Sequence, residues 1–246
     1  MQRHGLTYSE YARRGFFQLL TVSLITLALI LALDFLTDRQ SVRSRAVFLL
    51  GAGLMIVMTI VILASAYFRM QLYELAYGFT TLRVYPHIFM IWLAVLFAYF
   101  LIFLLANRTR YVATGVVITS LGFVVTMNLL NPDSFIVRQN IARYEAGETL
   151  DAAYLGTLSA DAIPALMPLL YQYDGKFLPE VAPWLHFQLN ELDRRALNAG
   201  WPSYHTSLAR AYHLLDANRP LLETFEAPSS RYAYDAVYGS YGETSR

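Results

Sequence analysis

Residues 46–68 read AVFLLGAGLMIVMTIVILASAYF, an apolar run without a charged side chain. Three further runs of the same character occupy residues 16–33, 88–106 and 112–130. At 1.5 Å per helical residue, runs of about 18 to 23 residues reach roughly 27 to 35 Å, enough to cross a hydrocarbon layer about 30 Å thick. The sequence therefore predicts an all-α protein built on a bundle of four membrane-spanning helices.

The composition of the chain changes near Asn131. The 246 residues are 56% hydrophobic, and the excess lies almost wholly before this point. Pro, Asp, Glu and Arg interrupt the apolar residues that follow it. We therefore expect a transmembrane domain over residues 1–130, a helical extramembrane domain over 131–223, and a flexible tail rich in Tyr, Ser and Gly over 224–246.

Charge and cysteine content exclude several classes of function. The formal net charge is +1, whereas a nucleic-acid-binding domain needs a basic surface to neutralise phosphates. The chain has no cysteine, which removes disulfides, thiolate nucleophiles and cysteine-ligated metals. We expect the partners to be the lipid bilayer and other membrane subunits, with no nucleic acid.

Between the second and third runs, residues 69–83 show an amphipathic pattern. Its apolar face, which begins at the preceding residue, follows the i, i+4, i+7, i+11, i+14 spacing through Phe68, Leu72, Leu75, Phe79 and Leu82. The segment is too polar to span, so we expect a helix lying in the membrane interface. One interpretation is a linker. The other is a ligand or lipid contact made by Arg69, Tyr73, Glu74, Tyr77 and Arg83.

Small residues within the runs indicate helix packing. Gly51 and Gly53 lie in the second run, and the fourth run carries Gly115, Thr119, Gly122 and Thr126 on one helical face. Because lipid supplies no hydrophobic drive between helices, close packing of such faces holds membrane bundles together. We expect these positions to face a neighbouring helix.

A polar cluster follows the fourth run: Asn128, Asn131, Asp133, Asn140 and Arg143. One interpretation is a helix cap, because Asn is a good cap and Pro132 suits a first helical turn. The alternative is a juxtamembrane polar pocket. Further along, Pro164 and Pro168 predict that a helix over residues 161–171 is kinked or shortened.

The residues give no sign of catalysis. No histidine lies in a G-x-S-x-G elbow or an H-E-x-x-H helix, and no glycine-rich phosphate loop is present. We therefore predict no catalytic residue, no metal and no cofactor, and lean towards a protein that is not an enzyme.

The arginines near the predicted membrane ends suggest an orientation. With four spans, one side carries Arg3, Arg13, Arg14, Arg69, Arg83, Arg138 and Arg143, and the other carries Arg39, Arg43, Arg45, Arg108 and Arg110. The positive-inside rule then places the N-terminus and the C-terminal domain in the cytoplasm.

Four strings carry a family resemblance: YSEYARRGFFQL at residues 8–19, RMQLYELAYGFTTLR at 69–83, NPD at 131–133 and LSADAIPAL at 158–166. They resemble the bacterial multi-pass membrane proteins grouped as DUF4173, a domain of unknown function related to DUF4153. The resemblance implies a helical fold in the bacterial inner membrane and implies no reaction. Family members usually carry spans before the first string, so we expect a shortened or split version.

Two functional hypotheses remain. The first is a non-enzymatic integral membrane subunit or scaffold that presents its helical domain to a partner complex. The alternative is a component of a transporter or membrane enzyme with a polar juxtamembrane site. Spans without charged residues disfavour autonomous ion transport.

Overall fold

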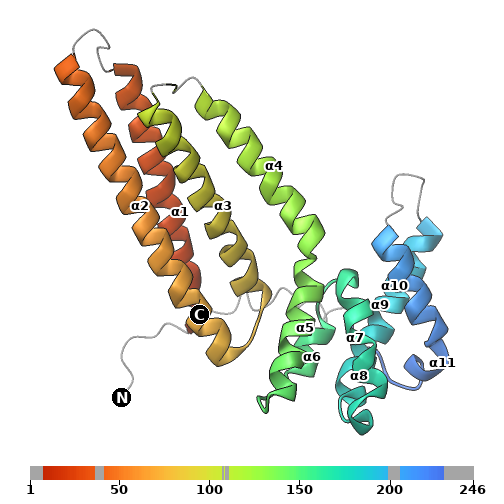
Figure 1. The fold of residues 1–246 in the computed structure, drawn as a ribbon. Helices are drawn as coiled ribbons and strands as arrows, with labels where there is room; N and C mark the ends of the chain where they lie inside the picture. Colours follow the sequence, from red (N-terminus) through yellow and green to blue (C-terminus); the bar gives the residue numbers. More distant parts are fainter. Residues whose placement is uncertain (1–7, 37–41, 107, 109–110, 199–205, 230–246) are drawn as a thin grey trace, which may run out of the picture. The chain divides into compact units, whose positions relative to one another are not determined.

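The structure is a computed structural model that describes residues 8–36, 42–106, 108, 111–198 and 206–229 (Figure 1). These residues form helices and connecting turns, with no strand among them, which confirms the predicted all-α class. The chain divides into two compact units, Met1–Leu129 (unit 1) and Leu130–Arg246 (unit 2). Most of the predicted flexible tail, residues 230–246, lies outside the described residues.

Unit 1 contains four long helices, namely α1 (Tyr8–Leu36), α2 (Val42–Tyr77), α3 (Thr81–Leu105) and α4 (Val112–Leu130). Among the described residues α2, α3 and α4 are long and apolar enough to cross a membrane. The described apolar part of α1 is shorter, Gln18–Ala32, within a helix of 29 residues. The predicted spans 16–33, 46–68 and 112–130 each fall within one helix, and the predicted span 88–106 ends one residue beyond α3.

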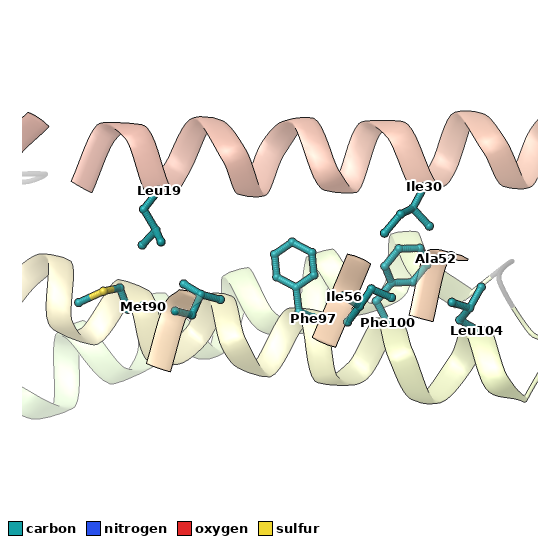
Figure 2. Packing of buried hydrophobic residues seen from close by; sticks show 9 residues of the cluster. Leu19, Ile30, Ala52, Ile56, Met90, Phe97, Phe100 and Leu104 are labelled. Atoms are coloured by element: carbon teal, nitrogen blue, oxygen red, sulfur yellow. The ribbon is translucent and has the colours of Figure 1, made fainter. Parts of the chain in front are cut away.

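The core of unit 1 lies between α1, α2 and α3, which run side by side (Figure 1). Figure 2 shows α3 contributing the two large rings, Phe97 and Phe100, towards Ile30 of α1 and Ile56 of α2. Leu19, Ala52, Leu63, Met90 and Leu104 complete the buried cluster. Most other apolar side chains of these helices point outward, among them Leu50, which is 75% exposed.

The prediction of a separate interfacial helix over residues 69–83 needs correction. Residues 69–77 are the last turns of α2, which continues unbroken from the apolar run, and α3 already begins at Thr81. Gly78 ends α2 because it adopts a positive φ of 80°, which glycine tolerates without steric cost. The segment is thus the end of a helical hairpin rather than one helix.

Unit 2 is a compact set of shorter helices, with α5 (Pro132–Glu145), α6 (Ala152–Gly156), η2 (Ala160–Ala162), α7 (Ile163–Leu166), α8 (Pro168–Tyr171), η3 (Tyr173–Gly175), α9 (Leu178–Asn198), α10 (Thr206–Ala217) and α11 (Arg219–Leu222). Pro164 and Pro168 each fall in the first turn of a new short helix, which confirms the predicted interruption. Ile163, Leu169, Leu185, Leu189 and Leu215 are fully buried. This core is enclosed by its own helices.

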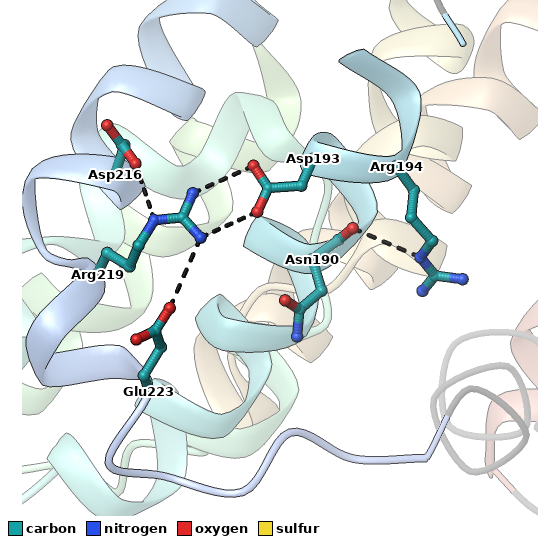
Figure 3. Close-up of polar contacts among 6 residues, drawn as sticks. All are labelled: Asn190, Asp193, Arg194, Asp216, Arg219 and Glu223. Atoms are coloured by element: carbon teal, nitrogen blue, oxygen red, sulfur yellow. Dashed lines mark hydrogen bonds and ion pairs between the residues drawn. The ribbon is translucent and has the colours of Figure 1, made fainter. Parts of the chain in front are cut away.

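One ion-pair network joins the last three helices of unit 2 (Figure 3). The guanidinium of Arg219 donates to both carboxylate oxygens of Asp193 at 3.0 and 3.1 Å and to Asp216 at 2.9 Å. Glu223 lies 3.7 Å away. The hydrogen bond from Arg219 lowers the pKa of Asp193, and the same contacts raise the pKa of Arg219. The network fixes α11 to α9.

Candidate functional site

The end of the α2–α3 hairpin holds a buried carboxylate and imidazole. Glu74 on α2 and His87 on α3 meet with 2.9 Å between Oε2 and Nδ1, and their side chains are 6% and 13% exposed. A buried carboxylate needs a hydrogen-bonding partner, because unpaired burial of the charge is costly. Pairing with His87 supplies that partner and fixes Nδ1 as the donor when the imidazole is neutral.

Tyr67 completes the surroundings of this pair from α2. Its ring stands edge-on to the imidazole, with 4.1 Å between the centroids. The other imidazole nitrogen, Nε2 of His87, is buried without a hydrogen-bond partner among the described residues. The ring is therefore oriented on one side by Glu74 and covered on another by an aromatic face.

Arg83 closes the turn between the two helices. Its guanidinium donates to the carbonyl of Gly78 at 2.6 Å and to that of Tyr77 at 3.1 Å. These carbonyls belong to the C-terminal end of α2, where helix geometry leaves acceptors unsatisfied and favours a cation. Arg83 thus caps α2.

The remaining predicted contact residues lie outward. Arg69 is exposed, and so is Tyr77. Tyr73 is half-buried and stacks on Tyr77 with 5.8 Å between the ring centroids. The five residues proposed as one contact therefore divide: Glu74 turns inward, Arg83 binds backbone, Arg69 and Tyr77 are exposed, and Tyr73 is half-buried against Tyr77.

The second predicted cluster contains a local cap in unit 2. Asn131 takes a positive φ of 47° and its Oδ1 accepts from the Ser134 amide, while its Nδ2 donates to the Asp161 carbonyl. Asp133, which is buried, accepts from the Ser159 amide at 3.2 Å. Both side chains therefore tie the start of α5 to the segment that precedes α7.

The other members of that cluster make separate contacts. Asn128, in unit 1, donates to the Val124 carbonyl within α4, and Asn140 donates to the Ile136 carbonyl within α5. Arg143 lies 3.6 Å from Glu148. Within unit 2, the described contacts of Asn131 and Asp133 are made at the start of α5, that of Asn140 within the helix, and that of Arg143 near its end.

The small-residue face of α4 receives aromatic rings from α3. A Cβ added at Gly115 would lie 2.2 Å from the Tyr99 ring, and one at Gly122 would lie 2.3 Å from the ring of Trp92. Trp92 also donates its Nε1–H to Thr126 Oγ1 at 3.1 Å. Thr119 is buried. In α2, a Cβ at Gly53 would just reach Leu101, and one at Gly51 would meet nothing within 4 Å.

The sequence patterns assign no site role to His87, which directly precedes the apolar run of residues 88–106. Its partner Glu74 lies on the other helix of the hairpin, so the spacing of residues within one segment does not predict the pair. The signal available was the amphipathic string itself, which places Glu74 on the far side of α2 from Leu72. Among the described residues, no cluster of three or more His, Cys, Asp or Glu side chains is arranged to hold a metal ion.

A family model described as a domain of unknown function, DUF4153, matches residues 1–169. The match covers all of unit 1 and the start of unit 2, including the Asn131–Asp133 cap and its contacts at Ser159 and Asp161. Helices α9 to α11 lie beyond it. No curated protein and no solved structure matches the chain.

Proposed function

The chain belongs to the DUF4153 family of unknown function, and from this premise we propose that it is a multi-pass integral membrane subunit. Unit 1 is the part embedded in lipid. Unit 2 is a helical domain held in water, where it is presented to a partner complex. The protein has no catalytic role of its own in this proposal.

The observation that supports this proposal is the opposite surface character of the two units. Large apolar side chains are exposed along every helix of unit 1, whereas in the described part of unit 2 they are Leu130 and Tyr171. A protein surrounded by water rarely exposes apolar patches beyond a few hundred Å². Acyl chains remove that cost for unit 1, and unit 2 needs no such cover.

The arginine distribution supports an orientation. The side of the membrane with more arginines carries the N-terminus, the α2–α3 turn and unit 2, so we propose that these face the cytoplasm of a bacterial cell. Partners of unit 2 would then be cytoplasmic proteins or the cytoplasmic faces of other membrane subunits.

A second candidate function has a specific observation in its favour. Ionisable residues buried between membrane helices mark functional sites by default, and Glu74 with His87 is such a pair. Under this alternative the protein is a component of a transporter or membrane enzyme, and the hairpin end takes part in its site.

Membrane integration is tested by alkaline carbonate extraction of cell membranes. The full chain should stay in the pellet. Leu54→Asp, at an exposed position within the α2 run, should reduce integration, because replacing leucine by aspartate there costs about 3 kcal/mol of insertion free energy. Tyr171→Asp is the control at an exposed position of unit 2, and it should integrate normally. Release of the unaltered chain by carbonate would refute the proposal.

The two candidate functions are separated by native mass spectrometry of the full chain extracted in a mild detergent. A stoichiometric protein partner supports the subunit. A bound small molecule that is lost in His87→Gln, while the chain remains folded and in the membrane, supports the alternative. A monomeric chain carrying neither would contradict both.

A further inference from the structure

The apolar surface of α2 continues past the end of its apolar run. Phe68, Leu72 and Leu75 are all exposed, Leu72 by 67%, and they follow the helical spacing of the outward leucines before them. From α3, Leu82 and Tyr85 add exposed apolar surface beside the turn. We call residues 68–85 the hairpin end.

The charged side chains of the hairpin end point in different directions. Its cation Arg69 lies outward, one helical turn from Leu72, and within the described part of the chain no hydrogen bond or ion pair engages it. Its carboxylate, Glu74, is turned into the helix interface against His87. Arg83 is directed at the backbone carbonyls of the turn. The outward surface is therefore apolar and cationic.

We propose that the hairpin end binds an anionic phospholipid, with acyl chains against Phe68, Leu72 and Leu75 and the phosphate on Arg69. This inference rests on the proposed function, since it requires unit 1 to lie in lipid. A guanidinium presents a planar fork that matches two phosphate oxygens, and its long stem lets the charge rise to the headgroup layer while the helix stays in hydrocarbon. Burial of Glu74 keeps the carboxylate off the surface that the phosphate approaches.

The position of Arg69 along α2 agrees with a phospholipid as the binding partner. Glu74 lies opposite His87, and the apolar run of α3 starts at Ile88. Because α2 and α3 run antiparallel, Arg69 lies beside residues of α3 that are already apolar. Its charge is therefore close to the boundary between hydrocarbon and headgroups, where phosphate is found.

The absence of cysteine permits a site-specific test on the full chain. Leu72→Cys is labelled with a fluorophore and the protein is reconstituted in phosphatidylcholine vesicles. The samples contain nitroxide-labelled lipid, either phosphatidylglycerol or phosphatidylcholine, over the same series of small fractions, and this lipid quenches a fluorophore that it contacts. Leu129→Cys is the matched control, since Leu129 is an exposed leucine at the C-terminal end of α4, a helix without arginine. The α3–α4 contacts place that end beside the start of α3, on the same side of unit 1 as the hairpin end.

The Leu72 probe should be quenched at about fivefold less phosphatidylglycerol than phosphatidylcholine, since one arginine near an anionic surface contributes about that factor. Arg69→Gln in the same background should abolish the preference, and the Leu129 probe should show none. Equal quenching by the two lipids at Leu72, or a preference that survives Arg69→Gln, overturns the inference. Quenching at Leu129 without any at Leu72 also overturns it, because a protein then covers the hairpin end. If neither probe is quenched by either lipid, the proposed membrane function itself fails.

Discussion

The two units of this chain differ in where their helices place apolar side chains. In unit 1 the apolar side chains cover the outside, and the inward faces also hold polar groups such as Glu74, His87 and Thr59. In unit 2 the leucines fill the inside, while the ion pairs of Arg219 lie near the surface. The surrounding solvent therefore determines which face each helix buries, because apolar surface needs cover only where water is the alternative.

The largest effect that separates the units is expected from one substitution made in both. Leu185→Ala should lower the free energy of unfolding by about 2 to 5 kcal/mol, because Leu185 is 0% exposed and its removal leaves a cavity. Leu54→Ala should change it by much less, because that side chain is 59% exposed and its replacement creates no cavity. Denaturant titration of the full chain in detergent, followed by circular dichroism, measures both.

Equal losses for the two variants would contradict the difference in burial between unit 1 and unit 2. They would mean that Leu54 is packed against protein in the native assembly. A loss at Leu185 alone would support that difference, because the two positions differ in the structure by burial and not by residue type.

Local patterns explain which parts of the fold were predictable from sequence. The apolar runs gave the helices of unit 1, and α4 spans the predicted residues 112–130, because crossing a bilayer imposes a length that can be counted. Prolines likewise marked the starts of α7 and α8. Both features are determined by residues that lie close together in the sequence.

The rest depended on contacts between distant residues. The change from apolar to amphipathic character predicts a separate helix over residues 69–83, whereas α2 continues through this change and ends before Gly78. The pairing of Glu74 with His87 joins two helices. Asn131 donates to the Asp161 carbonyl, 30 positions away, and Asp133 accepts from the Ser159 amide, 26 positions away. Periodicity within one segment carries no information about such partners.

The packing of α4 offers a test of intermediate size. Gly122→Ala should destabilise unit 1 by about 1 to 3 kcal/mol, because the new methyl group meets the Trp92 ring, which is itself held by a hydrogen bond to Thr126. Gly51→Ala is the matched control, since nothing lies within 4 Å of its Cβ position. Helix propensity alone predicts a gain of about 0.5 to 1 kcal/mol there.

Thermal unfolding of both glycine variants in the same detergent, followed by circular dichroism, provides the measurement. Destabilisation by Gly51→Ala as large as that by Gly122→Ala would show that another helix packs on the outward face of α2. The exterior of unit 1 would then make protein contacts rather than lipid contacts.

The smallest effect is expected from the ion pairs of unit 2, and it should depend on pH. The hydrogen bonds from Arg219 hold the pKa of Asp193 below its usual value, so the carboxylate stabilises the fold above that usual value and loses its contribution as the pH falls through the lowered pKa. Arg219→Gln should therefore lower the melting temperature slightly at pH 7, because both partners are about two-thirds buried and solvent still screens them. The difference from the unaltered chain should shrink on acidification below about pH 4.

Melting curves of the two proteins from pH 7 to pH 3 measure this difference, and Arg194→Gln, whose guanidinium pairs with Glu191 at the surface of α9, serves as the control. A difference that stays constant over this range would assign the role of Arg219 to its packing against α9 rather than to its charge. In that case Arg219 would stabilise unit 2 mainly by packing, as the inward-facing side chains of unit 1 do.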